Sequence, residues 1–183
     1  MDLSVIIVNY NSAALTLNCL HSIYENTKEL FYEVIVVDNA STDDSRKKIT
    51  DAFPDITWIQ NDYNAGFARA NNRGIQIAKG RIILLLNADT IVMDNALGET
   101  VKLFDAQPAY AACGVQLLNK DGSVQHSGAR FIKGGLNNLL PLPYLGKWLR
   151  SLAFSAGVKQ PNVFEVRKDE EVDWIVGAFL MTR

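Results

Sequence analysis

The sequence has few of the residues that build metal clusters, disulfide scaffolds or nucleic-acid surfaces. Its 183 residues include only two cysteines, Cys19 and Cys113, and neither shares a zinc-site spacing with a histidine or another thiol. This excludes a disulfide scaffold and favours a reducing compartment, the cytoplasm. Eighteen basic and twenty acidic side chains leave a net charge of −2, so we expect no nucleic-acid partner.

Long apolar runs and glycine-rich phosphate loops are also missing. The stretch from Leu3 to Tyr24 is uncharged, but polar residues interrupt it, and its fully apolar run extends only from Val5 to Val8. That run is too short for a membrane span or a signal peptide. Neither GxGxxG nor GxxxxGKS/T occurs between Asn64 and Gly74. A nicotinamide dehydrogenase and a P-loop ATPase therefore lose support.

Strand and helix patterns alternate along the first half of the chain. Apolar, largely β-branched runs at 5–8, 34–37, 56–59 and 82–86 predict buried strands, and apolar residues three or four positions apart predict helices between them. This alternation predicts an α/β fold, with a mostly parallel central sheet and flanking helices. We expect one domain over 1–183, with a regular half at 1–92 and a less regular half at 93–183.

The second half carries weaker patterns. A helix is expected around Leu97–Phe104. Strands are expected at Ala109–Leu118, at Val124–Phe131 after a turn at Asp121 and Gly122, and at Val172–Met181. The segment from Gly134 to Leu152, rich in leucine, proline and tryptophan, predicts either a contact with an acceptor or a membrane surface, or a packed lid loop.

Polar residues follow three of the predicted strands, at the edge where open parallel sheets bind ligands. They are Asn9 with Tyr10 and Asn11, Asp38 with Asn39, and Asn87 with Ala88 and Asp89. Asp38 could accept a hydrogen bond from a base or a ribose, and Asp89 could hold Mg²⁺ or Mn²⁺ against a diphosphate. Each carboxylate also has a structural alternative, Asp38 in an Asx turn or helix cap and Asp89 in a turn.

Four segments lie at the predicted strand ends and the start of a predicted helix: Val5–Asn11 (VIIVNYN), Val36–Asp43 (VVDNASTD), Asn64–Gly74 (NAGFARANNRG) and Leu84–Thr90 (LLLNADT). In this order and spacing they resemble the nucleotide-sugar glycosyltransferases of family 2. Two later segments, Gln125–Phe131 (QHSGARF) and Val172–Leu180 (VDWIVGAFL), resemble the rhamnosyltransferase-like branch of that family. The resemblance covers nearly the whole chain and implies the Rossmann-like fold called GT-A.

The family resemblance also implies an activity and its partners. The expected reaction is inverting transfer of a hexosyl group from a UDP or dTDP donor to the hydroxyl of a saccharide or lipid-linked saccharide, in cell-surface polysaccharide synthesis. The place would be the cytoplasm, at the inner face of the membrane. A catalytically silent nucleotide-sugar-binding domain or assembly partner remains an alternative, and a sugar-nucleotide pyrophosphorylase is a weaker one.

The resemblance further implies roles for individual residues. The nucleoside would be held around Val8, Asn9 and Tyr10, with Asp38 facing the base. The diphosphate side of the pocket would include Asn64, Gly66 and Asn72. Asn87, Ala88 and Asp89 take the place of the family's DxD motif, which leaves Asp89 as its one anionic metal ligand and predicts weak, donor-dependent binding of Mn²⁺ or Mg²⁺. The acceptor side would include His126, Trp174 and Gly177, although a surface or packing position is the more ordinary explanation for His126.

The catalytic base has no clear position in the sequence. The resemblance places it in an acidic motif beyond Arg183, so we expect either a shortened chain or a substitute carboxylate such as Asp173. A shortened chain would bind the donor but transfer sugar feebly. Its last strand, Val172–Met181, would then expose apolar surface and favour a homodimer.

Overall fold

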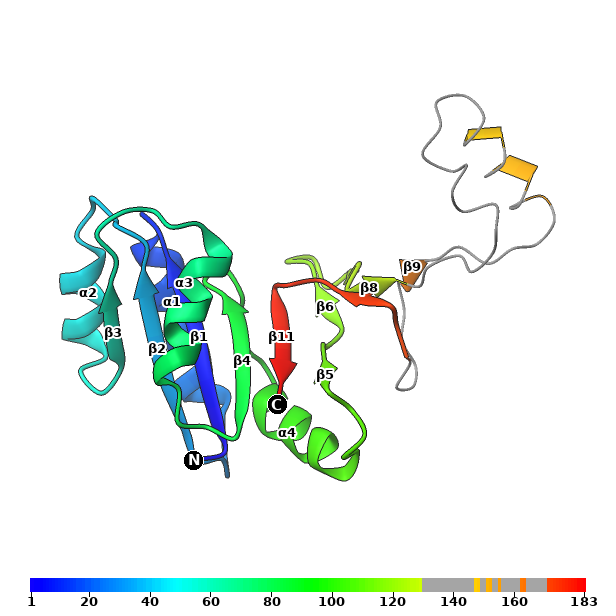
Figure 1. The fold of residues 1–183 in the computed structure, drawn as a ribbon, viewed down its shortest axis with the longest axis horizontal. Coiled ribbons are helices and arrows are strands. Elements are labelled where there is room, and N and C mark those ends of the chain that lie inside the picture. Colours follow the sequence, from blue (N-terminus) through cyan, green and yellow to red (C-terminus); the bar gives the residue numbers. More distant parts are fainter. Residues whose placement is uncertain (130–146, 149–150, 153–154, 156–161, 164–170) are drawn as a thin grey trace. The chain divides into compact units, whose positions relative to one another are not determined.

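The computed structural model describes residues 1–129, 147–148, 151–152, 155, 162–163 and 171–183 (Figure 1). These residues divide into two compact units. Unit 1 contains Met1–Cys113 and Gly177–Arg183, and unit 2 contains Gly114–Val176. None of the helices in these described ranges has the length and apolar character that a membrane span requires. The sequence segment Gly134–Leu152, for which an acceptor or membrane contact is predicted, lies largely outside the described residues.

A six-stranded sheet forms the centre of unit 1, in the order β3-β2-β1-β4-β11-β5. Its first four strands are parallel, namely β1 (Leu3–Asn9), β2 (Tyr32–Asp38), β3 (Thr57–Gln60) and β4 (Ile82–Asn87). Strand β11 (Phe179–Thr182) runs antiparallel between β4 and β5 (Ala112–Cys113). The predicted α/β fold with a mostly parallel sheet is confirmed.

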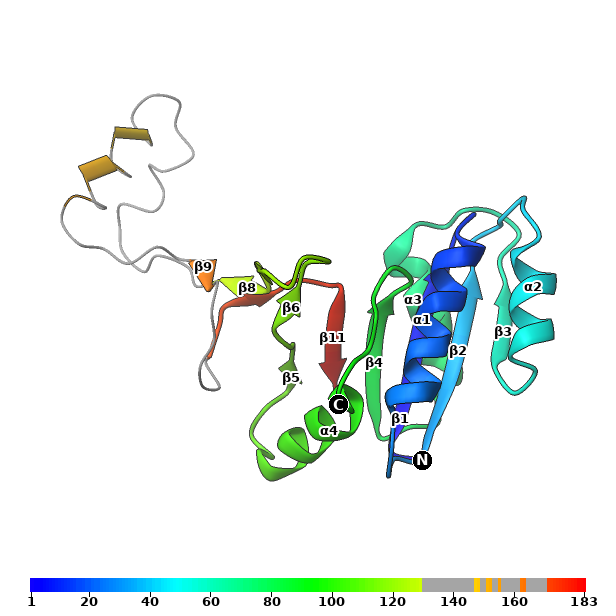
Figure 2. The ribbon, with the colours of Figure 1, turned by 180° about the vertical axis from the view of Figure 1, so that it is seen from behind.

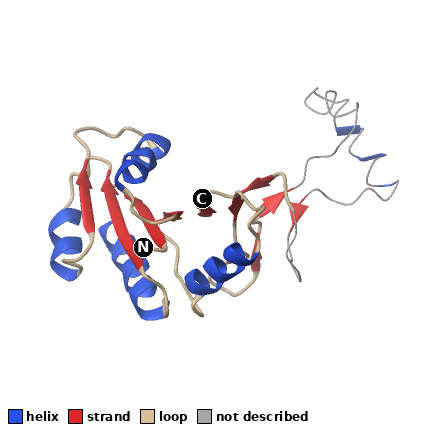
Figure 3. Cartoon of the chain, turned by 60° about the horizontal axis from the view of Figure 1, so that its bottom comes forward, coloured by secondary structure: helices blue, strands red, loops and turns tan. Residues whose placement is uncertain are grey.

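Helices cover both faces of the parallel strands. Helix α3 (Phe67–Ile77) lies over the face seen in Figure 1, and α1 (Ala13–Asn26) lies over the opposite face, seen in Figure 2. Helix α2 (Ser45–Ala52) lies beside α1, and α4 (Ala96–Ala106) follows β4 along the chain. Figure 3 shows, in red and blue, strands of the sheet with helices on both sides of them. Each predicted helix of the first half is present.

The core explains why β1 is apolar without alternation. Residues Leu3 to Ile7 are all buried, because helices cover both faces of the sheet. Ile6 joins Ile35, Val37 and Ala70 in a cluster beneath α3. A Cβ atom on Gly74 of α3 would lie 2.6 Å from Cγ2 of Ile6, so only glycine permits this close approach of helix and sheet.

The predicted strand at Ala109–Leu118 is wrong as a single element. It is divided into β5 and β6 (Leu117–Leu118) because these two segments pair with different partners, β11 and β7. The predicted strand at Val124–Phe131 is likewise β7 (Val124–Gln125) and β8 (Gly128–Ala129), and Phe131 lies outside the described residues. The predicted hairpin turn is confirmed, since β6 and β7 pair antiparallel and Gly122 has a φ of +81°.

The predicted strand at Val172–Met181 is also divided. Its first part is β10 (Trp174–Ile175), which pairs with β8, and β8 also pairs with β9 (Asn162–Val163). Its second part is β11, where Phe179 and Met181 are 3% and 0% exposed. The expectation of uncovered apolar surface is therefore wrong for Phe179 and Met181, whereas Trp174 of the same predicted strand is 40% exposed. Homodimer formation stays a prediction.

Candidate functional site

Strands β1, β2 and β4 end side by side at one edge of the sheet. Asn9 at the end of β1 is aligned with Asp38 at the end of β2, and Val8 is aligned with Asn87 at the end of β4. Gln60, at the end of β3, is aligned with Asp38 on its other side. The structure therefore brings three of the sequence motifs to a single edge.

Four hydrogen bonds surround the carboxylate of Asp38, which is 1% exposed. Its Oδ1 accepts from Nδ2 of Asn9 at 2.6 Å and from the hydroxyl of Ser41 at 2.6 Å. Its Oδ2 accepts from the backbone N–H of Ser41 at 2.8 Å and from Nε2 of Gln60 at 2.6 Å. A carboxylate offers about four acceptor positions, so all of them are in use. The bond from the Ser41 N–H shows that Asp38 makes the predicted turn contact.

The side chain of Asn9 is buried and fully hydrogen-bonded. Its Oδ1 accepts from the hydroxyls of Ser12 at 3.0 Å and Thr16 at 2.8 Å, while its Nδ2 donates to Asp38 and, at 3.1 Å, to Ser41. Because both donor and both acceptor positions of this amide are used, its contribution to a ligand site is to hold Asp38 in place. The neighbouring Tyr10 is 50% exposed, and Val8 is partly exposed.

Asn39 connects the end of β2 to the segment that leads into α3. Its Nδ2 donates to Oδ1 of Asn64 at 2.7 Å, and its Oδ1 accepts from Nδ2 of Asn61 and the N–H of Ala65, both at 2.9 Å. Oδ1 of Asn64 also accepts from the N–H of Gly66 at 3.0 Å. The second and third motifs of the sequence therefore form one hydrogen-bonded unit.

Gly66 precedes α3 with a φ of +80°, a conformation that favours glycine. The side chain of Asn72 is exposed on α3. The amino end of a helix directs backbone N–H groups outward and suits phosphate oxygens. The predicted diphosphate side thus has suitable backbone geometry.

Asn87 is the last residue of β4, and Ala88 and Asp89 form the turn that follows it. The N–H of Thr90 donates to the carbonyl oxygen of Asn87 at 3.2 Å, and the N–H of Asn87 donates to the carbonyl of Ala178 at 3.0 Å. Ala178, which accepts this hydrogen bond, directly follows Gly177 in the sequence. The side chain of Asp89 is exposed.

Cys19 of α1 lies close to this turn. Its Sγ donates to the carbonyl oxygen of Asn87 at 3.7 Å. Burial first, and then the negative charge of Asp89, raise the pKa of the Cys19 thiol to about 12. The Cys19 side chain is fully buried, whereas Cys113 is only partly buried.

The two later motifs meet within unit 2. The rings of His126 and Trp174 lie 5.2 Å apart in an edge-to-face arrangement, and the N–H of Val176 donates to the carbonyl of Ser127 at 2.9 Å. Asp173, next to Trp174, is exposed. Two of the three residues predicted on the acceptor side are thus in contact, and the third, Gly177, belongs to unit 1.

The sequence motifs assign no role to Gln60 or Asn61. Gln60 follows an apolar run, as Asp38 does, but this run is short and forms an edge strand. Asn61 is 3% exposed and accepts a hydrogen bond from Arg73 of α3. The position directly after a predicted strand was the available signal for both residues.

Comparison with known proteins identifies the family. Residues 4–158 match the model of the family described as glycosyl transferase family 2. The chain belongs to this family. The fold, the order of the motifs and their meeting at one sheet edge are therefore features of a family 2 glycosyltransferase domain.

Similar proteins include curated bacterial relatives and a solved archaeal structure. Glycosyltransferase GlyG of Streptococcus pneumoniae is 33% identical over 99 residues, which cover 52% of this chain and 32% of that protein. The Escherichia coli UDP-Glc:alpha-D-GlcNAc-diphosphoundecaprenol beta-1,3-glucosyltransferase WfaP is 30% identical over 125 residues, which cover 64% of this chain and 47% of that protein.

The solved structure is the mannosyltransferase PcManGT of Pyrobaculum calidifontis in complex with GDP-Man and Mn²⁺. It has a TM-score of 0.57 and 30% identity, and the match covers 63% of this chain and 35% of that one. The chain spans about a third of the length of GlyG. The similarity therefore covers only a part of each of these proteins.

Proposed function

We propose that this chain binds the donor of an inverting glycosyltransferase, which moves a hexosyl group from a nucleoside diphosphate to an acceptor hydroxyl in cell-surface polysaccharide synthesis. The observation that carries the proposal is the alignment of Asn9, Asp38 and Asn87 at the carboxyl ends of neighbouring parallel strands. The names of WfaP, a glucosyltransferase with a UDP-Glc donor, and of PcManGT, solved with GDP-Man, support the same donor class.

The donor would lie across the ends of β2, β1 and β4. Asp38 would accept an N–H from the base, since a carboxylate without a proton can only accept. Uracil and thymine present such a group at N3, as guanine does at N1. The exposed ring of Tyr10 offers an apolar surface to the nucleoside. Asn64, Gly66 and Asn72 would line the diphosphate, and Asn87, Ala88 and Asp89 would face the sugar phosphate.

A divalent cation fits this site only together with the donor. Among the described residues no group of three or more histidine, cysteine, aspartate or glutamate side chains could hold a metal ion. Mg²⁺ and Mn²⁺ commonly bind through one or two carboxylates plus substrate phosphates. Asp89, which is exposed, would hold the ion beside Asn87. A bound cation would offset the charge that develops on the leaving diphosphate.

The acceptor side is proposed for His126, Trp174 and Gly177, with residues 1–92 binding the donor and 93–183 contributing to the acceptor site. Inversion requires a general base on the sugar face opposite the diphosphate. Asp173 is one candidate for that base. The acceptor would be a saccharide or lipid-linked saccharide at the inner face of a membrane, and self-association into a homodimer is part of the same proposal.

Calorimetric titration with UDP and dTDP in the presence of Mn²⁺ tests donor binding. We expect wild type to bind, and both Asp38→Ala and the same-sized Asp38→Asn to weaken binding about ten- to hundredfold, since a charge-assisted hydrogen bond is lost. Asp89→Asn should remove the Mn²⁺ dependence alone. Asp105→Asn, a carboxylate change in the last turn of α4, is the matched control.

Absence of heat with UDP, dTDP and GDP would reject the proposal, as would unchanged binding in both Asp38 variants. A domain that binds donor without transferring it would give the same heat. Transfer of labelled sugar to an acceptor separates an active enzyme from such a silent binding domain.

A further inference from the structure

Gln60 covers the carboxylate of Asp38 from the edge of the sheet. Its Nε2 donates to Oδ2 of Asp38 at 2.6 Å, and its Oε1 accepts from Nε1 of Trp58 at 3.1 Å. An indole nitrogen can only donate, so the oxygen of the Gln60 amide must face Trp58. The amide nitrogen is therefore directed at Asp38 by an independent contact.

The other donors to Asp38 are held more firmly. Asn9 is 0% exposed and is fixed by bonds to Ser12 and Thr16. Ser41 donates through its backbone as well as its hydroxyl, and that hydroxyl also accepts from the N–H of Asn11 at 2.8 Å. Of the four donors described around this carboxylate, Gln60 is the one whose side chain is exposed. A rotamer change of Gln60 removes it at the cost of its contacts with Nε1 of Trp58 at 3.1 Å and with the carbonyl oxygen of Asn61 at 3.4 Å.

We infer that Gln60 occupies the position of the nucleobase N–H on Asp38 and is displaced when the donor binds. This inference rests on the proposed function. With all acceptor positions of Asp38 in use, an incoming N–H can bind only by replacing a donor already present. Displacing an exposed side chain disrupts the least structure. Gln60 therefore lowers the affinity for the donor and sets how strongly that affinity varies with the identity of the base.

Whether a substitution of Gln60 strengthens or weakens nucleotide binding distinguishes competition with the base from direct contact with the ligand. If Gln60 competes with the base, removing its amide strengthens binding, whereas removing a residue that contacts the ligand weakens it. The gain should appear for uracil, which presents a ring N–H. It should be smaller for cytosine, whose ring N3 is an acceptor, so that only the exocyclic amino group at that edge can donate to a freed carboxylate oxygen.

The test compares Gln60→Met with wild type by calorimetric titration of UDP and CDP with Mn²⁺. Methionine keeps the length of the side chain and has no donor. We expect UDP to bind about three- to tenfold more tightly to Gln60→Met, and CDP to change less than about twofold. Trp58→Phe, which frees the Gln60 amide without removing it, should give a smaller gain for UDP. Gln76→Met, an exposed glutamine change on α3, is the matched control and should leave both affinities unchanged.

Unchanged or weaker UDP binding in Gln60→Met, while wild type binds UDP and Asp38→Asn binds it more weakly, would overturn the inference and leave the proposed function standing. An equal gain for UDP and CDP would also overturn it, because the competition would then not involve the base. If wild type binds no nucleotide, the proposed function fails together with the inference. Melting curves of each variant show that the altered proteins are folded.

Discussion

Unit 1 and unit 2 differ in strand length and in how deeply they bury apolar side chains. In unit 1, β1 and β2 contain seven residues each, and the core includes side chains that are fully buried. In unit 2, the described strands contain two residues each, and no hydrophobic side chain among its described residues is buried. The residues predicted to bind the sugar donor are thus supported by a packed core. His126 and Trp174 are supported by short strand pairings and by the contact between their own rings.

Ile6→Ala should give the largest loss of stability. Ile6 is 0% exposed and packs against Ile35, Val37 and Ala70, so truncation leaves a cavity and lowers the free energy of unfolding by about 2–5 kcal/mol. Leu118→Ala in unit 2, at a side chain that is 46% exposed, should cost below about 1 kcal/mol. Urea unfolding followed by circular dichroism measures both. Equal losses of unfolding free energy in the two variants would contradict the difference in packing between unit 1 and unit 2.

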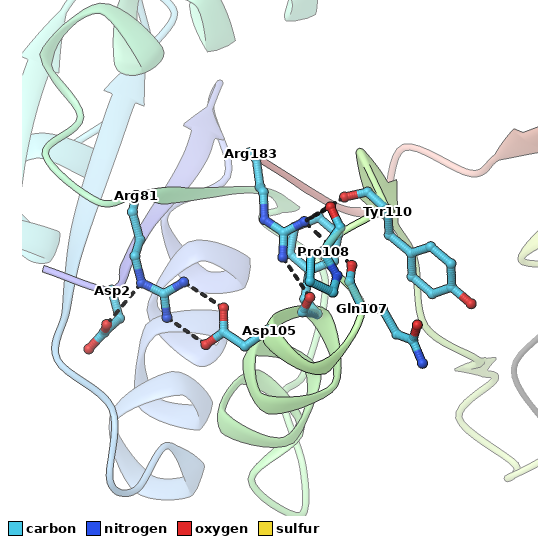
Figure 4. A network of polar contacts seen from close by, with 8 residues as sticks. Asp2, Arg81, Asp105, Gln107, Pro108, Tyr110 and Arg183 are labelled. Carbon is cyan, nitrogen blue, oxygen red and sulfur yellow. Dashed lines mark hydrogen bonds and ion pairs between the residues drawn. The ribbon is translucent and has the colours of Figure 1, made fainter.

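Arg183→Ala should have an intermediate effect within unit 1. The guanidinium donates to the carbonyl oxygens of Phe104 at 2.6 Å, Tyr110 at 2.8 Å and Pro108 at 3.1 Å, and lies 4.3 Å from the centre of the Phe104 ring (Figure 4). These contacts satisfy carbonyls at and after the end of α4.

Their loss should lower the free energy of unfolding by about 1–2 kcal/mol, and Arg183→Lys should restore only part of it, since lysine lacks the planar fork. Urea unfolding of the three proteins measures this order. Full recovery with lysine would show that charge alone is responsible.

Asp105→Asn should have the smallest effect, and one that depends on pH. Arg81 donates to both oxygens of Asp105 at 2.5 and 2.6 Å, and its guanidinium also reaches Asp2 at 3.2 Å (Figure 4). The hydrogen bond from Arg81 holds the pKa of Asp105 below its usual value. Both side chains are 42–47% exposed, so solvent screening limits the contribution to about 0.5 kcal/mol.

Because the folded pKa lies below the unfolded one, this stability is fully present above a pH of about 4 and is lost as the pH falls through the folded pKa. Asp105→Asn should therefore lower the melting temperature slightly at pH 7, and by less at a pH well below about 4. An equal difference at both pH values would show that the ion pair is not its cause.

The parallel half of unit 1 could be predicted because its signals are local. The run from Val5 to Val8 needs no partner to indicate a strand buried on both faces, and the residues that follow such strands mark the ligand edge. Asp38 and Asn87 lie where this reasoning places them. Gln60 was not predicted as a neighbour of Asp38, since only strand pairing between β2 and β3 aligns the two residues.

From its residues alone, the chain specified an α/β fold, its family and the strand ends where polar groups gather, because periodicity and motif order are properties of short segments. Tertiary structure alone decided that residues 179–182 enter the sheet between β4 and β5, and that four donors fill the carboxylate of Asp38. These outcomes join residues far apart in the chain, and they depend on register, burial and competition for hydrogen bonds that no local pattern records.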